Sequence, residues 1–192
     1  LNALKGETMA VIALCQFDLT RCFGYPYTKD KGASLGAPLI DHLVGTYENP
    51  PRSTVAQAYD FIIETLEEAV TLMSEEKNNG RMNKYAARAL LARIYLYHDD
   101  NRKAFDLADQ LIKDADTSGS YALYPHEKYV AAWSVEAKFG SESFFEIANS
   151  VDDTPGRDSW GYLLNWYGYQ KGFVTQKYAE QMLADPGDVR GQ

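Results

Sequence analysis

Apolar residues recur at three- and four-residue spacing in several separate stretches of the chain, which is the pattern of helices that bury one face. The first such stretch runs from Ala3 to Phe23, and Gly24 followed by Pro26 ends it. The sequence therefore predicts that the chain begins with a helix over residues 3–23.

A second helix is predicted to open at Val55, with Ser53 or Thr54 as its N-terminal cap. Its apolar face carries Ala58, Phe61, Ile62, Leu66, Ala69, Val70 and Met73. Its other face carries Glu64, Glu67 and Glu68. No group with an evidently opposed environment accompanies these carboxylates, so a solvated helix face explains them better than acid–base chemistry does.

The clearest helical pattern lies between Gly80 and Ile112, where the spacing of apolar residues predicts two consecutive helices. Residues 85–97 contain no Gly or Pro and are rich in Ala, Leu and Arg, which favour helix formation. The polar residues 98–101 interrupt this pattern, and an Asp or Asn among them can cap a helix that begins near Arg102. A turn this short makes the two helices antiparallel.

This helix pair resembles a tetratricopeptide unit, because Leu91, Ala92, Tyr95 and Ala104 fall at the spacing that the repeat uses. Alanines on both helices allow their faces to approach closely. The match is partial, since Arg88 stands where the repeat usually has a large apolar residue.

The remaining segments have weaker helical patterns and more aromatic residues. Residues 24–52 are rich in Gly, Pro and Tyr and are predicted to form a long ordered loop. The segment SESFFEIANS has the composition of a short extended stretch, and a last short helix is expected from Val174 to Ala184.

We therefore expect a mainly α-helical fold in one domain over residues 1–192. Residues 1–115 form a scaffold of tetratricopeptide-like antiparallel helix pairs, an α-α superhelix. Residues 116–192 form irregular, aromatic-rich, ligand-facing segments with minor short strands and the terminal helix.

Composition limits the class of protein. The chain has 192 residues of which 45% are hydrophobic, which is enough for one sizeable core. A formal net charge of −8 and scattered Lys and Arg residues argue against a nucleic-acid partner. No apolar run approaches the roughly 20 residues of a spanning helix. Because the first residues already read as the body of a helix, we interpret the sequence as a fragment that lacks the N-terminal signal region and the C-terminal part.

Cys15 and Cys22 are the two cysteines of the chain. On one helix their Cα atoms lie about 10 Å apart, whereas a disulfide needs about 4.4–6.8 Å. Two cysteines are also too few for a structural zinc site. They are predicted to be small, semi-buried helix residues, and we expect no metal or cofactor.

Four short motifs follow one another along the chain. A Gly-Glu start at Gly6 leads to a Phe-Asp-Leu run, an Arg and a Phe-Gly pair. A Gly-Arg lead at residues 80–81 precedes Ala-Leu-Leu-Ala-Arg-x-Tyr-Leu, and SFFEIANS follows. The last motif is KYAEQMLADPGDVRG, with an acidic turn at Asp185 and Asp188 that leads to Arg190.

Taken together, the four motifs resemble the SusD/RagB family of outer-membrane nutrient-binding proteins. Two positions depart from the family pattern, because Ile12 stands where an arginine is expected and Gln16 where a histidine is expected. The resemblance implies a lipoprotein, anchored outside this fragment, on the outer-membrane cell surface of Bacteroidota-like bacteria. It also implies capture of a glycan or other nutrient, delivery to a TonB-dependent SusC-like transporter, and no enzymatic activity.

The aromatic segments are the candidate ligand contacts. Sugar rings have an apolar CH face, so flat amphipathic side chains with polar neighbours suit them. The preferred contacts are Trp160, Tyr162, Asn165, Trp166 and Tyr169, with Arg157 and Asp158 as polar neighbours. The secondary candidates are the loop residues Tyr25, Tyr27 and Tyr47. The alternative reading is that aromatic residues in glycine-rich loops fold back into satellite hydrophobic clusters.

Two other functions remain open. A tetratricopeptide-type scaffold would bind a protein or peptide on its concave helical face, but the unusual residues of this chain lie outside the predicted helices. A helical glycoside hydrolase would need two carboxylates about 5–10 Å apart across a cleft, and no such pair stands out. His42, His98 and His126 lack the spacing of a metal-binding helix motif.

Overall fold

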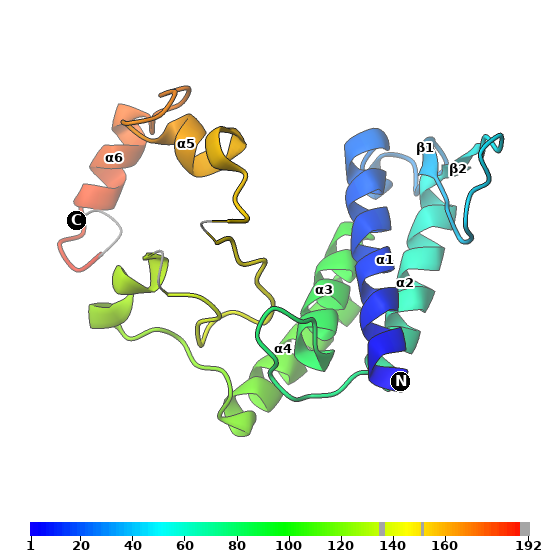
Figure 1. Cartoon of the computed structure of the whole chain (residues 1–192), viewed down its shortest axis with the longest axis horizontal. Helices are drawn as coiled ribbons and strands as arrows, with labels where there is room; N and C mark the ends of the chain where they lie inside the picture. Colours follow the sequence, from blue (N-terminus) through cyan, green and yellow to red (C-terminus); the bar gives the residue numbers. More distant parts are fainter. Residues whose placement is uncertain (135–136, 151, 189–192) are drawn as a thin grey trace. The chain divides into compact units, whose positions relative to one another are not determined.

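A computed structural model of the chain describes residues 1–134, 137–150 and 152–188 (Figure 1). The chain divides into two compact units. The helical unit comprises Leu1–Ala122 with Ser143–Phe145, and the second unit comprises Leu123–Glu142 with Glu146–Gln192. Across the described ranges, no helix combines the length and the apolar character that crossing a membrane requires.

The helical unit contains four long helices, which confirms the predicted mainly α-helical fold. They are α1 (Asn2–Phe23), α2 (Val55–Leu72), α3 (Lys84–Tyr97) and α4 (Asn101–Ser118). The predicted cap of α2 is confirmed, because the Thr54 hydroxyl accepts a hydrogen bond from the Gln57 backbone N–H. The Gln57 side chain accepts one from the Thr54 N–H in return.

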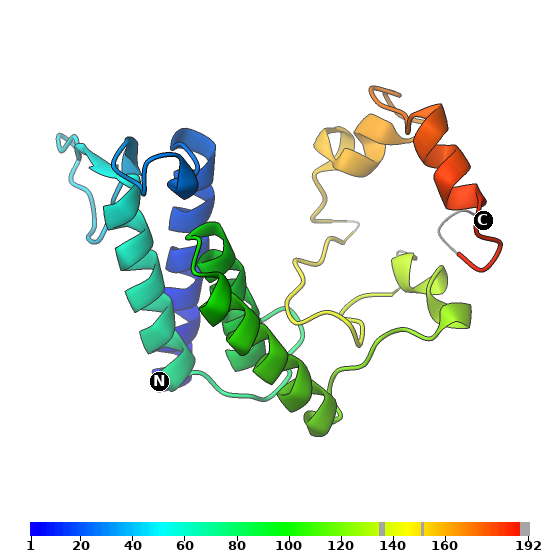
Figure 2. The same ribbon diagram turned by 180° about the vertical axis from the view of Figure 1, so that it is seen from behind.

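The core of the helical unit lies between α1, α2 and α3. Phe17, Ile62, Leu66 and Ile94 are each 0% exposed there. In Figure 1 α1 lies in front of α2 and α3, and seen from behind in Figure 2 these two helices cover it. The approach is close at Gly6, where an added Cβ would lie 2.7 Å from Met73 Cγ. A glycine is therefore required at this contact between α1 and α2.

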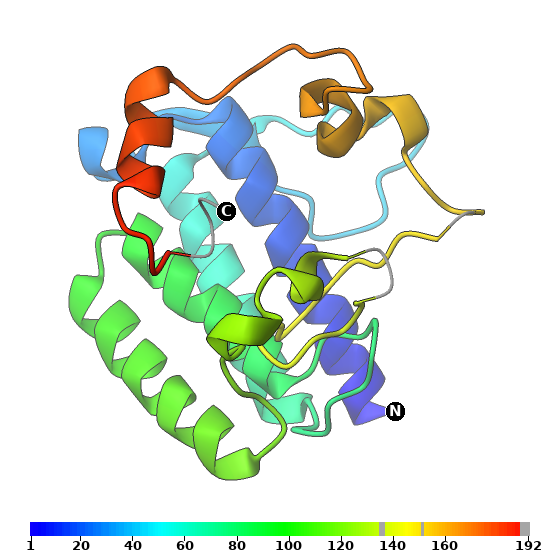
Figure 3. The same cartoon turned by 90° about the vertical axis from the view of Figure 1, so that its left-hand side faces the viewer.

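The predicted helix pair is α3 and α4, which lie side by side (Figure 3). Asp99 in the turn between them adopts a φ of 69°, which is a left-handed conformation. Asp100 occupies the N-cap position of α4, but its carboxylate pairs with Lys103 at 3.2 Å and makes no capping hydrogen bond. Tyr95 and Ala104 both belong to the core, as the tetratricopeptide spacing predicts.

Arg88, the departure from the repeat pattern, forms an ion pair with α4. Its Nη1 lies 2.7 Å from Asp114 Oδ2, and only 13% of the Arg88 side chain is exposed. The pKa of Asp114 lies below its usual value because Gln110 donates a hydrogen bond to its carboxylate and because Arg88 lies beside it. An interhelical ion pair thus stands where the repeat usually has an apolar contact.

We expect Asp114→Asn to lower the melting temperature at pH 7 but to have no effect in strong acid. A carboxyl group with a lowered folded-state pKa stabilises the fold above its unfolded pKa of about 3.9, and that contribution is lost as the pH falls through the folded pKa. The measurement is the melting temperature of both proteins from pH 7 to pH 2. The matched control is Asp116→Asn, an exposed residue of the same helix. If the melting temperature of Asp114→Asn were lower by the same amount at every pH, the prediction would be contradicted.

The ordered loop predicted over residues 24–52 contains short regular elements. It contains a 3-10 turn (Tyr27–Lys29), and β1 (Leu35–Pro38) pairs antiparallel with β2 (Arg52–Thr54). The Arg52 guanidinium holds the loop ends together, because it donates hydrogen bonds to the carbonyl oxygens of Phe23, Leu35 and Gly36. The prediction of one long ordered loop thus omitted these short elements, and residues 39–51 are irregular.

Two of the sequence motifs meet in the helical unit. Glu7 from the Gly-Glu start accepts hydrogen bonds from the Arg81 guanidinium and, at 3.1 Å, from the Met82 backbone N–H. Arg81 belongs to the Gly-Arg lead, which lies 74 residues further along the chain. We call this contact the Glu7–Arg81 link; it joins α1 to the segment that enters α3.

The segment Ser143–Ser150 does not form the expected strand. No strand of the described chain includes it, and Phe144 packs its ring 4.7 Å from that of Tyr121 and 6.3 Å from that of Tyr85. Side-chain packing rather than strand pairing therefore holds Phe144 in the helical unit.

The second unit consists of short elements. These are three 3-10 turns (His126–Lys128, Ala131–Trp133 and Gly156–Asp158), α5 (Trp160–Leu164) and α6 (Gln176–Leu183). The predicted final helix is confirmed as α6. The acidic turn is present, because the Asp188 N–H donates to the Asp185 carbonyl. Arg190 of the same motif lies outside the described residues.

The prediction for the cysteines is right about bonding and wrong about burial. Cys15 and Cys22 are both free, and both are exposed rather than semi-buried. They lie outside the buried side of α1, which carries Ala10, Ala13 and Phe17. Periodicity places them on one helix face but does not reveal whether a neighbour covers that face.

Candidate functional site

The preferred aromatic segment, residues 160–169, folds back on itself in the second unit. Ser159 caps α5, since its hydroxyl accepts from the Tyr162 N–H at 3.1 Å. The Tyr169 N–H donates to the Tyr162 carbonyl at 2.9 Å and closes the fold-back. Gly168 is required in it, because an added Cβ would lie 1.8 Å from the Tyr162 carbonyl oxygen.

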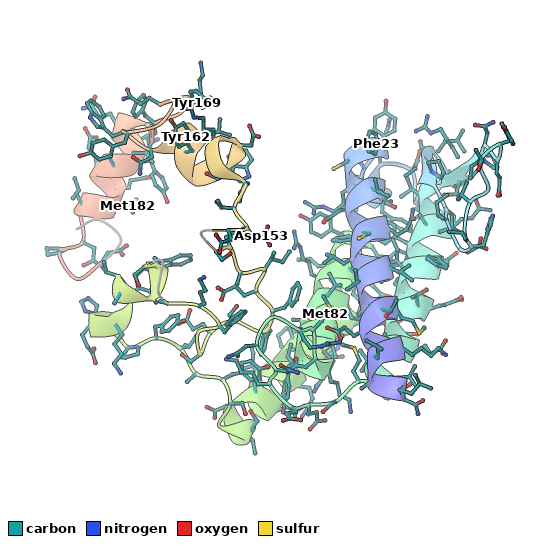
Figure 4. All side chains as sticks on the ribbon, viewed as in Figure 1. Phe23, Met82, Asp153, Tyr162, Tyr169 and Met182 are labelled. Carbon is teal, nitrogen blue, oxygen red and sulfur yellow. The ribbon has the colours of Figure 1, made fainter. Side chains whose placement is uncertain are left out.

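This fold-back brings some of the predicted contacts together. Tyr162 and Tyr169 form an edge-to-face pair with ring centroids 5.1 Å apart (Figure 4). The Asn165 side-chain oxygen accepts from the Tyr167 N–H at 2.8 Å, so this amide helps to shape the turn. Arg157 and Asp158 lie in the preceding 3-10 turn and are exposed.

The two tryptophans of the segment present their rings to solvent. Trp160 is 79% exposed, Trp166 is 70% exposed and Tyr169 is 48% exposed. If these rings packed into a local hydrophobic cluster within the segment, far less of their surface would be accessible to solvent. The alternative interpretation, in which these aromatic residues only pack into a hydrophobic cluster, therefore suits the half-buried Tyr162 better than Trp160 or Trp166.

A second candidate surface is a hollow of about 340 Å³ in the helical unit, where α1 ends. We call it the tyrosine hollow. Its lining residues are Thr20, Arg21, Cys22, Gly24, Tyr25, Pro26, Tyr27, Tyr59 and Tyr97. Two of the three secondary candidates, Tyr25 and Tyr27, are among them. The third, Tyr47, is not; it is 95% exposed on the irregular part of the loop.

Aromatic contacts and one cation shape the tyrosine hollow. The rings of Tyr27 and Tyr59 lie 5.6 Å apart, and the ring of His98 lies 4.2 Å from that of Tyr27. The Arg21 guanidinium lies 4.8 Å from the Tyr97 ring centroid. Burial raises the pKa of the Tyr59 hydroxyl to about 12, so this hydroxyl keeps its proton at neutral pH. The hollow thus combines flat apolar walls with hydrogen-bond donors.

Sequence reasoning missed Arg21, Tyr59 and Tyr97 as lining residues. Tyr59 and Tyr97 lie within helices, where periodicity assigns aromatic residues to packing. A usable signal was the position of Tyr97 at the last residue of a predicted helix, where little core remains to be filled.

The Asp30 and His98 side chains each hold one buried polar atom without a protein partner in the described structure.

The described residues show no cluster of three or more His, Cys, Asp or Glu side chains suited to a metal ion. His42 instead lies between two carboxylates, with Nδ1 2.6 Å from Asp41 and Nε2 2.7 Å from Glu48. Hydrogen bonds to these carboxylates raise the pKa of His42 above its usual value. This exposed arrangement closes a turn of the loop.

The chain is similar to known proteins over most of its length. Residues 1–96 match the model of the SusD-like family described as starch-binding and associating with the outer membrane. A crystal structure from Bacteroides vulgatus ATCC 8482, whose suggested role is sugar binding, is 41% identical with a TM-score of 0.88 and matches 96% of this chain and 42% of that one.

A SusD superfamily protein from Bacteroides thetaiotaomicron VPI-5482 is 33% identical with a TM-score of 0.83, over 96% of this chain and 41% of that one. The present chain thus spans about two fifths of the length of either relative. No curated protein matches the chain. The family model over half of the chain and the two solved relatives agree with the four motifs, and the chain belongs to the SusD-like family of carbohydrate-binding proteins.

Proposed function

We propose that this chain is part of a cell-surface protein that captures an oligosaccharide or similar nutrient and passes it to a TonB-dependent, SusC-like transporter in the outer membrane. It works by reversible binding and carries out no covalent chemistry. The protein is held at the outer membrane by a lipid anchor outside residues 1–192. Membership of a starch-binding, outer-membrane-associated family supports this function, as does the suggested sugar-binding role of the Bacteroides vulgatus relative.

The observation that carries the proposal is the exposure of Trp160 and Trp166 on a folded-back segment. A sugar ring gains little from a hydrophobic pocket alone, because its hydroxyl groups must remain hydrogen-bonded. An exposed indole offers a flat apolar face to the CH side of the ring and leaves the hydroxyls free to reach water or neighbouring polar groups. Asn165, Arg157 and Asp158 lie close in sequence and supply such groups.

The test is a titration of the full-length protein with a panel of polysaccharides and oligopeptides, followed by tryptophan fluorescence and by an assay for released reducing sugar. We expect saturable quenching by at least one glycan, with no released sugar. Binding of peptides alone would replace the proposal with a tetratricopeptide-type scaffold. Release of reducing sugar would replace it with a glycoside hydrolase.

The transporter partner is tested separately. We expect the full-length protein to fractionate with the outer membrane and to copurify with a TonB-dependent barrel after gentle detergent extraction. Replacement of the lipid-bearing cysteine should release it from the membrane without changing glycan affinity. If the protein binds glycans but does not copurify with a barrel, the proposed delivery to a transporter would be contradicted, whereas the proposed glycan binding would stand.

We expect Tyr25→Ala to weaken binding of the glycan found in the panel, because Tyr25 lines the tyrosine hollow and is 57% exposed. The expected loss is about threefold to tenfold, which corresponds to roughly 1 kcal/mol for one partly exposed stacking ring. The measurement is isothermal titration calorimetry. Tyr47→Ala is the matched control, since Tyr47 belongs to the same loop but not to the hollow. Equal effects of the two changes would remove the hollow from the binding surface.

A further inference from the structure

The helix α1 is apolar on two sides. One side packs into the core through Ala10, Ala13 and Phe17. The opposite side carries Leu4, Val11, Ile12, Cys15, Leu19, Cys22 and Phe23, with the polar residue Thr8 between Leu4 and Val11. These seven residues, which we call the outer face of α1, are all exposed.

Exposure of the outer face is considerable for apolar side chains. Leu4 is 54% exposed, Leu19 is 43% exposed and Phe23 is 64% exposed. Scattered exposed apolar residues are ordinary on a protein surface, but seven of them on one side of a helix of 22 residues are not. A helix that is apolar around most of its circumference is typical of one that lies between two packed layers.

The neighbouring helices show that this is a property of α1 rather than of the whole unit. The outward side of α2 carries Glu64, Glu67 and Glu68, which are exposed. The outward side of α4 carries ion pairs, including Arg102 with Asp106 at 2.8 Å and Lys113 with Asp109 at 2.6 Å. The outward sides of α2 and α4 are thus mainly charged, whereas the exposed charged residues of α1 are limited to Lys5, Asp18 and Arg21.

The cysteines of the outer face are a second sign of a covered surface. Cys is among the residue types most often buried in proteins, and an exposed free thiol is open to oxidation. Both cysteines of this chain lie on the outer face. Their position is easily understood if another segment shields them in the complete protein.

The lengths of the relatives indicate what that segment is. The two solved relatives keep this fold with TM-scores of 0.88 and 0.83, yet the matched stretch makes up only 42% and 41% of their chains. More than half of each relative is therefore additional polypeptide that must pack on something. We propose that the outer face of α1 is an intramolecular interface, covered by an apolar segment of the same polypeptide outside residues 1–192.

The two thiols report directly on this interface. The experiment compares the rate of maleimide labelling of Cys15 and Cys22, followed by peptide mass spectrometry, in the 192-residue chain and in the full-length protein. We expect rapid labelling of both thiols in the 192-residue chain. In the full-length protein we expect labelling of Cys15, near the middle of the face, to be at least tenfold slower.

A substitution provides an independent measurement. Leu19→Glu should leave the melting temperature of the 192-residue chain unchanged, because Leu19 is exposed there, but should lower it in the full-length protein. Leu43→Glu is the matched control; Leu43 is 97% exposed on the irregular loop and should have no effect in either protein.

Three outcomes would overturn the proposal. Equal labelling rates in the two proteins would mean that the outer face stays open. Protection that grows with the concentration of the 192-residue chain would mean that a second copy covers it. Protection in the 192-residue chain at every concentration would mean that no further polypeptide is needed.

Discussion

Phe17→Ala is expected to lower the free energy of unfolding of the helical unit by about 3–5 kcal/mol, the range for a large side chain removed from a core. Phe17 is 0% exposed and makes edge-to-face contacts with Tyr97 at 5.4 Å and Tyr59 at 6.2 Å. The substitution removes these contacts and leaves a cavity that α1 and α2 cannot close easily, because Gly6 already brings them close together. Urea unfolding followed by circular dichroism measures the change.

The control for Phe17 comes from the same helix. Val11→Ala removes an apolar side chain that is 41% exposed, and should change the stability of the 192-residue chain by less than about 0.5 kcal/mol. If Phe17→Ala costs no more than Val11→Ala, then the core of the unit does not lie where the structure has it. The comparison is made in the 192-residue chain, where the outer face of α1 is exposed.

The second large effect is expected on binding. Trp160→Ala and Trp166→Ala together should reduce glycan affinity below detection, since an anchoring tryptophan is typically worth about 2 kcal/mol or ~30-fold. The melting temperature should hardly change, because both rings are largely exposed. Calorimetric titration with the glycan identified in the panel measures the loss.

The third tryptophan of the chain supplies the matched control. Trp133 is 76% exposed and belongs to the second unit, but it lies outside residues 160–169 and instead contacts Tyr129 with ring centroids 6.1 Å apart. Trp133→Ala should therefore leave affinity intact. If it weakens binding as much as the double substitution does, the assignment of the aromatic segment is wrong.

The helices could be predicted because their signals are local. Helix periodicity, the Thr54 cap and the stretch between Tyr85 and Tyr97 each depend on residues within a few positions of one another. These signals located α1, α2, α3, the start of α4 and the final helix α6 to within two residues, but the predicted pair stopped at Ile112 whereas α4 continues to Ser118. The same local information did not predict the short helix α5, which begins at Trp160.

The features that could not be predicted depend on contacts between distant residues. The β1–β2 pair is stabilised by hydrogen bonds from Arg52 to Phe23, Leu35 and Gly36, which lie 16 to 29 residues earlier in the chain. The tyrosine hollow needs Tyr25, Tyr59 and Tyr97 from three different segments. Burial of Cys15 was predicted wrongly for the same reason, because a helical pattern shows which residues share a face but not which face meets a neighbour.

The Glu7–Arg81 link has a consequence for how the protein is made. Its partners are 74 residues apart, so the link can form only after both α1 and α2 have been synthesised. Until then α1 lacks this contact, and most of the stability of a helix in a protein comes from tertiary packing rather than from its own propensity. Its apolar residues remain accessible for several seconds at a synthesis rate of about 5–20 residues per second. The segment that contains Arg81 must therefore leave the ribosome before α1 gains this contact.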